Sequence, residues 1–344
     1  MNRMIPPRKP PTMVDVARAA GVSAMTVSRA FKQDGSITDK TRAQIMDAAE
    51  ALGYVFDVTA SNLRSQRSHF VAATIPSINN ANFADTLRGL TEGLAQHGMQ
   101  ILLGYTNYDT AEEERLIERL LQRRPEAMVV TGGTHTPRAR RLLANAGVPI
   151  VETWDLPADP IGHVVGFSNA LAVRGMVDHL VAQGAHKIAF IGGDASRDTR
   201  GSDRRRGFVA AMAAHGLVAD RLIASGPPPI SMREGAETMG RLLDQYPDTE
   251  AVICVSDLSA FGALSECQRR GVSVPGKIML AGFGDYEIAG ICVPSLTTTN
   301  ALAYDIGRRT AEVIIAAQSG GATEPARIEI APQLILRGST AIAR

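Results

Sequence analysis

The sequence predicts a small all-α domain at the N-terminus, followed by an α/β body of two Rossmann-like lobes. Three observations support this fold class. Residues 1–68 contain helix caps and helical apolar spacing but no strand pattern. From Phe70 onward, short β-branched or apolar runs alternate with helical segments, which is typical of parallel sheets covered by helices. The alternation occurs in two successive series, so we expect two lobes.

The N-terminal domain begins after a basic, proline-rich leader over residues 1–11, which we expect to be disordered. Thr12 and Asp15 fit a capping box at the start of a first helix, which ends at Gly21. A second helix follows Ser23. The expected helices cover 12–21, 24–31 and 38–52, and the buried stripe of the third is Ile45, Ala48, Ala49 and Leu52.

Two helices joined by a short glycine-containing turn are the signature of a helix-turn-helix, which we predict over residues 12–56. We expect the second helix to enter the major groove of DNA, with base contacts from Ala24, Met25, Thr26 and Arg29. Short hydroxyl side chains suited to phosphates are Thr12, Ser23, Ser28 and Thr38. Each of these hydroxyls is equally suited to capping a helix, and a helical hairpin without a ligand is the alternative.

The charge distribution agrees with a DNA-binding head. Residues 1–68 contain ten Lys and Arg against six Asp and Glu, whereas the remainder contains 26 against 29. A basic module on a slightly acidic body indicates that only the N-terminal part binds nucleic acid.

Composition argues against several other classes of protein. The chain has no apolar run long enough to cross a membrane and no secretory signal, so we expect a cytoplasmic protein. Its three cysteines, Cys254, Cys267 and Cys292, and its seven scattered histidines lack metal-ligand spacing. We therefore expect reduced thiols, no metal site and no cofactor.

The body contains eight expected strands and seven expected helices. The strands are 70–75, 100–105, 127–131, 149–151, 164–166, 187–191, 251–255 and 278–281. The helices are 82–97, 111–122, 137–146, 170–183, 204–215, 233–245 and 258–270. Ligands of open parallel sheets bind at the carboxyl ends of the strands, so two facing lobes predict a cleft.

The segments Asp15–Ser23, Thr26–Arg29, Thr41-Arg42 and Gly53-Tyr54 together resemble the lac/gal repressor family of bacterial transcription regulators. The resemblance extends over nearly the whole chain, at Pro76, Phe83, Arg204–Phe208, Ser256-Asp257, Gly271–Pro275, Gly282-Phe283 and Pro294–Thr298. It implies a periplasmic-binding-protein-like sensor over 69–344 that binds an effector and dimerises. It also implies three strands that cross between the lobes and a helix at 300–319 that returns to the first lobe. Lobe 1 is expected at about 69–166 and 299–326, and lobe 2 at about 167–298 and 327–340.

The resemblance also implies a hinge between the two parts of the chain. Residues 57–68 are expected to form a hinge helix, over Asp57–Ser65, and a linker. Ala60 and Leu63 occupy the positions that enter the minor groove, where an inserted leucine kinks DNA. The family's usual proline and asparagine are replaced by Phe56 and Asp57, and Asp57 is suited to cap the hinge helix.

Effector-binding roles come to this chain by the same resemblance, at Asn82, Phe83, Trp154, Arg200, Arg204, Asp257 and Asp285. Arg204 matches the family's central arginine, and Arg200 lies one helical turn earlier. Other roles stay open: Arg204 as a structural charge, Asp257 as a helix cap, and Trp154 as packing under a loop. Gly284 stands where the family often has an aspartate that binds ligand hydroxyls.

Gly282–Asp285 and Glu152–Asp155 are similar to the gluconate-repressor branch of the family. An arginine-rich cleft that lacks one carboxylate suits an anionic sugar acid. The expected effector is therefore gluconate or a related hexonate, and a neutral sugar or a nucleobase is the alternative.

An α/β enzyme is the rival class of function. The sequence has neither the glycine spacing of a dinucleotide loop, nor a Walker lysine, nor a Gly-x-Ser-x-Gly elbow, and Cys254 lies in an apolar strand. A purely architectural DNA-binding protein would not need the long body. We therefore expect a repressor, not an enzyme, that binds a palindromic operator as a homodimer without a tetramerising tail. The sequence leaves open whether the effector releases or recruits it.

Overall fold

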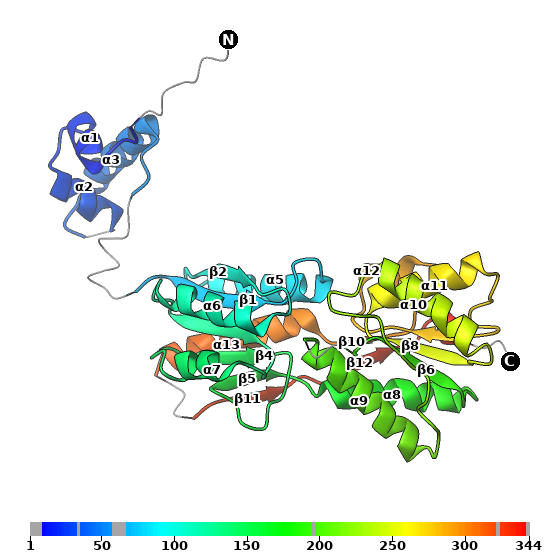
Figure 1. Ribbon diagram of the computed structural model, residues 1–344. Helices are drawn as coiled ribbons and strands as arrows, with labels where there is room; N and C mark the ends of the chain where they lie inside the picture. Colours follow the sequence, from blue (N-terminus) through cyan, green and yellow to red (C-terminus); the bar gives the residue numbers. More distant parts are fainter. Residues whose placement is uncertain (1–8, 33–34, 57–66, 195–196, 321–323, 342–344) are drawn as a thin grey trace, which may run out of the picture. The chain divides into compact units, whose positions relative to one another are not determined.

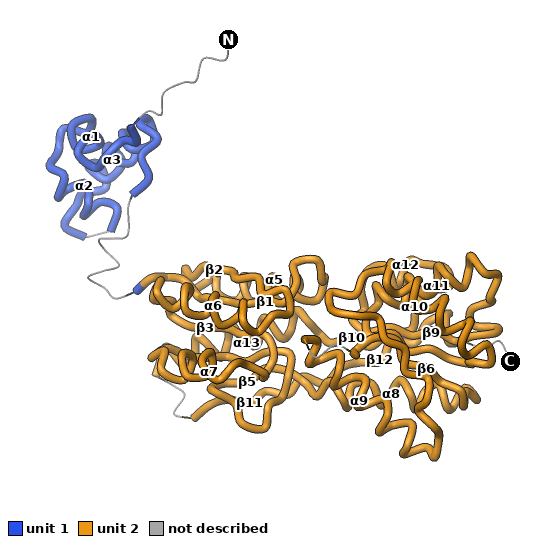
Figure 2. The backbone as a smooth tube through the Cα atoms, in the orientation of Figure 1, with its two compact units in different colours: residues 1–67 blue, residues 68–344 orange. Residues whose placement is uncertain are grey.

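The computed structural model describes residues 9–32, 35–56, 67–194, 197–320 and 324–341. The chain forms two compact units, residues 1–67 and 68–344, which Figure 2 shows in different colours. Each unit is described by itself below.

Unit 1 contains three helices, α1 (Met13–Ala19), α2 (Ala24–Phe31) and α3 (Asp39–Leu52). Their bounds confirm the predicted helices. Each begins after a hydroxyl residue, and α3 ends at Gly53, whose φ of 64° is the left-handed conformation that favours glycine. The core of the unit includes Val16, Val27, Ala30, Ile45 and Ala49. The predicted stripe was wrong at Leu52, which is 40% exposed because the last turn of α3 extends past this small core.

The first lobe of unit 2 is built on a six-stranded parallel sheet with strand order β11-β5-β4-β3-β1-β2. The strands are β1 (Phe70–Ile75), β2 (Gln100–Tyr105), β3 (Ala127–Thr131), β4 (Ile150–Thr153), β5 (His163–Gly166) and β11 (Arg327–Glu329). Four helices cover the sheet: α5 (Ala81–Ala95) and α13 (Ala303–Gln318) pack on one face, and α6 (Thr110–Leu121) and α7 (Pro137–Ala144) on the other (Figure 1).

The second lobe has a four-stranded parallel sheet with strand order β7-β6-β8-β9. The strands are β6 (Ile188–Ile191), β7 (Leu222–Ile223), β8 (Ala251–Cys254) and β9 (Met279–Ala281). Helices α8 (Asn169–Ala182) and α9 (Thr199–Ala214) pack on one face, and α10 (Met232–Gln245) and α11 (Asp257–Arg269) on the other. The short α12 (Glu287–Ile291) follows β9, and a 3-10 turn covers Gly338–Thr340.

The chain passes between the lobes three times, after β5, after β10 (Thr298–Asn300) and after β11. Strand β10 pairs antiparallel with β12 (Gln333–Ile335). The expected change from the first lobe to the second at residue 327 was wrong, because β11 pairs with β5 and belongs to the sheet of the first lobe. None of the described helices is both long and apolar enough to span a membrane.

Helices α5 and α13 pack unusually closely against each other. A Cβ atom added to Gly89 would lie 2.2 Å from the Tyr304 carbonyl oxygen, and one added to Gly307 would lie 2.0 Å from the Thr86 oxygen. The absence of side chains at these two positions allows the helix backbones to meet. This packing holds α5, which carries Asn82 and Phe83, firmly against the sheet.

Candidate DNA interface and effector site

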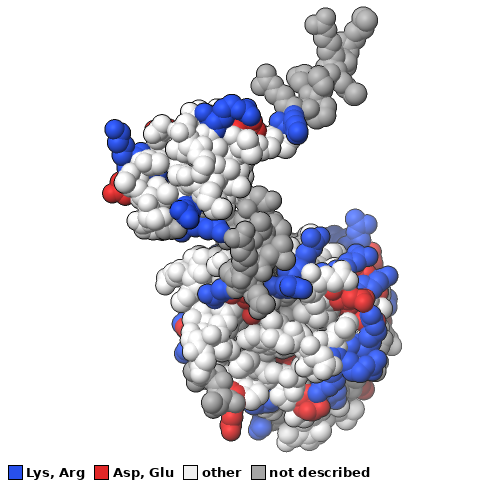
Figure 3. Space-filling view, turned by 90° about the vertical axis from the view of Figure 1, so that its left-hand side faces the viewer, with Lys and Arg blue, Asp and Glu red and all other residues white. Residues whose placement is uncertain are grey.

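Helix α2 presents one face to the core of unit 1 and leaves the other face open. Val27 and Ala30 are buried, whereas Arg29 is exposed and Met25 is 64% exposed. The four residues with expected base contacts are therefore at least partly accessible. Figure 3 shows more Lys and Arg than Asp and Glu on the visible surface of unit 1, as a polyanionic partner requires.

The predicted phosphate hydroxyls serve as helix caps in this structure. The Thr12 hydroxyl donates to Asp15 at 2.6 Å. The Ser23 Oγ atom accepts from the Thr26 amide at 3.2 Å, and the Thr38 Oγ1 atom accepts from the Thr41 amide at 3.3 Å. Capping fixes the helix N-termini, whose free amides are themselves suited to phosphates. Ser28 is partly exposed on α2, and Ala60 and Leu63 lie outside the described residues, together with the expected hinge helix.

The candidate effector site is a cavity of about 140 Å³ between the lobes of unit 2. Five of the seven predicted effector residues line it: Asn82, Phe83, Trp154, Arg200 and Arg204. The first three come from the first lobe, whereas the two arginines come from α9 in the second lobe.

The arginines share one helix face because α9 begins earlier than expected. Asp198 caps α9 by accepting a hydrogen bond from the Gly201 amide at 2.9 Å, so the helix starts at Thr199 instead of Arg204. The polar run from Thr199 to Asp203 contains no apolar residue that would reveal a helix in the sequence. Arg200 and Arg204 therefore lie one turn apart in the same helix.

Phe83 and Trp154 form an aromatic wall of the cavity. Their ring centroids are 5.3 Å apart in an edge-to-face arrangement. The Trp154 indole N–H donates to the Thr86 hydroxyl at 3.1 Å, which fixes the ring. The φ of Trp154 is 69°, a left-handed conformation that is costly for a bulky residue.

Arg204 is held from two sides. Its guanidinium stacks 4.3 Å from the Phe283 ring centroid and donates to the Asn169 Oδ1 atom at 2.8 Å. The Asn169 amide in turn donates to the Trp154 carbonyl at 2.9 Å. Burial lowers the pKa of Arg204, and its Nε atom is buried without a hydrogen-bond partner among the described residues.

Arg200 lies closer to the first lobe. It is 6% exposed and donates to the Thr131 carbonyl at 3.4 Å, across the cleft. Its guanidinium is 5.8 Å from the Phe83 ring centroid. The two arginines therefore put two cations on the cavity wall, and the carboxylate that lines the cavity, Asp198, already caps α9.

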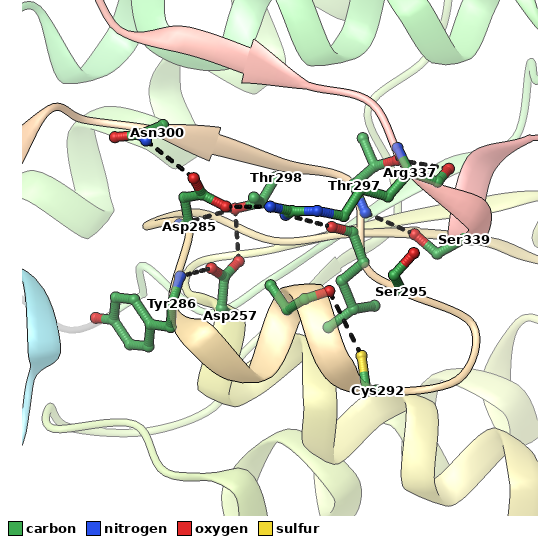
Figure 4. Close-up of polar contacts among 12 residues, drawn as sticks. Asp257, Asp285, Tyr286, Cys292, Ser295, Thr297, Thr298, Asn300, Arg337 and Ser339 are labelled. Atoms are coloured by element: carbon green, nitrogen blue, oxygen red, sulfur yellow. Dashed lines mark hydrogen bonds and ion pairs between the residues drawn. The ribbon is translucent and has the colours of Figure 1, made fainter.

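Asp257 does not line the cavity. It is fully buried, and its two carboxylate oxygens accept hydrogen bonds from the Thr298 hydroxyl at 2.6 Å and the Tyr286 amide at 2.8 Å (Figure 4). Burial raises the pKa of Asp257 to about 6. The prediction of a direct ligand contact is replaced by a role in holding Tyr286.

Asp285 also lies outside the cavity lining. Its carboxylate accepts from Arg337 at 2.6 Å and from Asn300 at 2.9 Å. In Figure 4 it lies between these two partners, while the Tyr286 ring points away from them. The Asp285 carboxylate is therefore used in an ion pair with Arg337.

Sequence reasoning missed several polar residues of the cavity, and all of them lie in loops or at helix ends. They are Ser77, Asn79, Asn80, Tyr108, Asp198, Ser231, Ser256 and Tyr286. Each follows an expected strand or precedes a helix, and this position was the one signal that could have identified them. Within the described residues, no group of three or more His, Cys, Asp or Glu is arranged to hold a metal ion.

Comparisons with known proteins agree with this architecture. Residues 12–57 match the family model "Bacterial regulatory proteins, lacI family", and residues 177–340 match the "Periplasmic binding protein-like domain". The HTH-type transcriptional regulator GntR of Pseudomonas aeruginosa is 36% identical over 330 residues, which are 96% of each chain. The regulator IdnR of Escherichia coli is 32% identical over 306 residues, which are 88% of this chain and 91% of the relative.

The solved structures that resemble this chain include a LacI-family transcriptional regulator from Silicibacter pomeroyi. It superposes with a TM-score of 0.89 at 32% identity, over 96% of this chain and 99% of that chain. The helix-turn-helix unit, the two-lobed body and these relatives support one conclusion. The chain belongs to the lacI family of bacterial regulatory proteins and is a DNA-binding transcriptional regulator.

Proposed function

We propose that this regulator is a repressor whose operator affinity is controlled by a sugar acid, gluconate or a related hexonate. The observation that carries the proposal is the pair of cations, Arg200 and Arg204, on the wall of a cavity between the lobes. Guanidinium groups bind carboxylates through charge-assisted and often bidentate hydrogen bonds. The Nε atom of Arg204 is buried without a partner among the described residues, which supports a hydrogen-bond acceptor supplied by the ligand.

The size and the remaining lining suit a six-carbon ligand. A cavity on the order of 150 Å³ holds benzene in another protein, and this one measures about 140 Å³. Phe83 and Trp154 offer an apolar wall for the carbon chain, and asparagine, serine and tyrosine side chains are available for its hydroxyls. A neutral sugar or a nucleobase is the competing effector.

Operator binding is proposed to use the residues of α2 and the helix N-termini of unit 1. Base contacts are assigned to Ala24, Met25, Thr26 and Arg29, and phosphate contacts to Thr12, Ser23, Ser28 and Thr38. Ala60 and Leu63 are proposed to enter the minor groove.

The repressor is proposed to act as a homodimer on a palindromic operator, since two-fold protein symmetry matches a palindrome. Strand β2 forms an edge of the six-stranded sheet, and Leu103 and Tyr105 on it are each 42% exposed. An accessible edge with apolar side chains suits pairing with a second copy. The chain is proposed to work in the cytoplasm without catalysing a reaction.

Coupling between effector and DNA is proposed to act through the relative position of the lobes. Contacts already cross the cleft, for example from Arg197 to the Asn107 carbonyl at 2.8 Å. An effector that prefers one lobe arrangement with a coupling of about 1–3 kcal/mol would change operator affinity roughly 5- to 150-fold.

The experiment is a calorimetric titration of the full chain with gluconate and, in parallel, with glucitol, which has the same carbon chain without the carboxylate. The proposal expects gluconate to bind more tightly, and increasing salt to weaken gluconate binding more than glucitol binding. Equal binding of the two ligands, or binding of neutral sugars or nucleobases alone, would contradict the assigned effector class.

A further inference from the structure

Asn169 joins a cavity arginine of the second lobe to the tryptophan of the first lobe. It is 1% exposed and is the first residue of α8, which follows the first passage of the chain between the lobes. Its Oδ1 atom accepts from the Arg204 Nη1 atom at 2.8 Å, and its Nδ2 atom donates to the Trp154 carbonyl at 2.9 Å. Asn169 does not line the cavity, so it can act on a ligand only through these two neighbours.

The bond to Asn169 determines which edge of the Arg204 guanidinium stays free. Asn169 occupies Nη1, and the guanidinium stacks on the Phe283 ring at 4.3 Å from the centroid. Among the described residues, neither Nε nor Nη2 has a hydrogen-bond acceptor. The N–H groups of Nε and Nη2 form one edge of the planar fork and point in the same direction. Such an edge makes two parallel hydrogen bonds with a carboxylate.

Close packing of α8 on α9 holds Arg204 beside Asn169. A Cβ atom added to Gly207 would lie 2.1 Å from the Ala170 carbonyl oxygen, so the backbone of α9 touches α8 at the residue after Asn169. Gly207 is three residues after Arg204 and therefore lies on the same face of α9. The two helices cannot slide past each other without losing this contact.

Asn169 also fixes a strained residue of the first lobe. Trp154 has a φ of 69°, and such a conformation persists only where its surroundings impose it. The Trp154 amide donates to the Val165 carbonyl at 3.2 Å, and its indole N–H donates to the Thr86 hydroxyl. Asn169 supplies the donor for the remaining polar group, the carbonyl, so the amide, the carbonyl and the indole each have a partner.

Aromatic rings connect Arg204 and Trp154 a second time. The ring centroids of Phe283 and Phe167 are 6.1 Å apart, and those of Phe167 and Trp154 are 5.8 Å apart. The three rings belong to one hydrophobic cluster, and Arg204 stacks on the first of them. A change in the position of Arg204 therefore reaches Trp154 through the rings as well as through Asn169.

The cavity also contains one carboxylate, Asp198, which is folded back over the first turn of α9. It accepts from the Gly201 amide at 2.9 Å, and a Cβ atom added to Gly201 would lie 1.9 Å from its second oxygen. Within the described part of the chain, Asp198 forms no ion pair with Arg200 or Arg204, so it does not occupy the free edge of Arg204. These two cations and one carboxylate are the charged residues that line the cavity, and one ligand carboxylate balances them.

We propose that Asn169 is a positioning residue of the effector site, which leaves the Nε–Nη2 edge of Arg204 for the ligand carboxylate and ties Arg204 to Trp154. This inference rests on the proposed function and adds to it a residue outside the cavity that determines selectivity for an anion over a neutral polyol.

The test compares gluconate with glucitol by calorimetry on the full chain, in wild type and two variants of Asn169. Asn169→Ala removes the acceptor for Nη1 and should weaken gluconate binding roughly tenfold, because a bond to a charged group depends on it, and leave glucitol binding nearly unchanged. Asn169→Asp keeps the size and the acceptor but neutralises the charge of Arg204, so it should also weaken gluconate binding alone. Asn145→Ala is the matched control, since this exposed amide also donates to a backbone carbonyl, and it should change neither affinity.

A double-mutant cycle with Arg204→Lys separates positioning from a purely structural role. Lysine keeps the positive charge but has no guanidinium edge that a neighbour could orient. Asn169→Ala should therefore reduce gluconate affinity in the wild-type background and change it little in the Arg204→Lys background. Trp154, the single tryptophan, provides a spectroscopic readout. Saturating gluconate should change its fluorescence more than glucitol does, and this difference should disappear in Asn169→Ala.

Additive effects of Asn169→Ala and Arg204→Lys, or equal losses for both ligands in either Asn169 variant, would overturn the inference while the wild-type preference for gluconate stands. A fluorescence difference that survives in Asn169→Ala would overturn the link to Trp154. If wild type binds gluconate no better than glucitol, the proposed effector class itself fails. Because Asn169→Asp preserves the volume of this buried side chain, it keeps the test decisive should Asn169→Ala fold poorly.

Discussion

Replacing His135 with glutamine removes a cation shared by two buried carboxylates. The His135 Nδ1 atom lies 2.8 Å from the Glu113 carboxylate, and its Nε2 atom lies 3.6 Å from the Glu152 carboxylate. Glu152 is fully buried and also accepts from the Ile161 amide at 2.6 Å. Burial alone would lower the pKa of His135, but the two carboxylates outweigh it and raise the pKa to about 9.

The size of the effect follows from this pKa. A rise from 6.5 to about 9 corresponds to about 3 kcal/mol of folding free energy. Because the folded-state pKa is the higher one, this stabilisation is fully present below pH 6.5 and is lost as the pH rises through 9. His135→Gln should therefore cost about 3 kcal/mol near pH 6.5, and this difference from wild type should shrink as the pH rises from 6.5 toward 9.

Urea unfolding at pH 6.5, 7.5 and 9.5 measures this difference. Trp154 is the single tryptophan of the chain and is buried in the first lobe, so its fluorescence reports on the lobe that contains His135. His97→Gln, at an exposed position, is the control and should leave stability unchanged. A difference that is absent, or that stays constant from pH 6.5 to 9.5, would refute the reasoning.

Three further substitutions test other parts of the structure. Arg29→Ala should weaken specific operator binding by about 1–3 kcal/mol and relax the preference at one base pair, as measured by anisotropy with substituted operators. Gly89→Ala should lower the free energy of unfolding by roughly 1–3 kcal/mol, because the new methyl group meets the Tyr304 carbonyl at 2.2 Å. The free energy of unfolding of Asp257→Asn should rise by about 3 kcal/mol relative to that of wild type between pH 4 and pH 7. Burial raises the folded-state pKa of Asp257 to about 6, so the folded wild-type protein is destabilised when this carboxyl group ionises.

Each of these substitutions has a result that counts against it. Arg29→Ala that weakens all DNA sequences equally would make Arg29 a phosphate contact. Gly89→Ala with wild-type stability would mean that α5 and α13 separate without cost. A pH-independent difference between Asp257→Asn and wild type would show that Asp257 does not titrate in this range.

Local signals predicted unit 1 well. Its helix bounds depend on the caps Thr12, Ser23 and Thr38 and on the stop at Gly53, all of which act within one turn of their own position. In unit 2 the longer strands were also predictable, because three to five apolar residues in a row are visible in the sequence.

The strands that were missed are short and paired over long distances. Strands β7, β10, β11 and β12 contain two or three residues each, and β11 pairs with β5 more than 160 residues earlier in the chain. A run this short has no periodicity, and its pairing depends on tertiary structure.

Only part of the cavity lining could be predicted, because its other residues also come together through tertiary structure. Arg204 and Phe83 could be placed by family resemblance, whereas Tyr286 becomes a neighbour of Asn80 only when the two lobes approach each other. Asp285 illustrates the opposite error, because its partner Arg337 is 52 residues away and no local pattern reveals the ion pair.

The most direct test of effector control is operator binding by three proteins with and without gluconate. A labelled palindromic operator, selected from genomic fragments that the wild-type protein binds, is titrated with wild type, Arg204→Gln and Arg206→Gln. Arg206 is the control, because it lies two residues after Arg204 but is exposed and pairs with Asp203. We predict that gluconate changes the operator affinity of wild type and Arg206→Gln roughly 5- to 150-fold, and that Arg204→Gln binds the operator without responding. A gluconate response that survives in Arg204→Gln, or a wild-type protein that responds only to neutral ligands, would contradict the account.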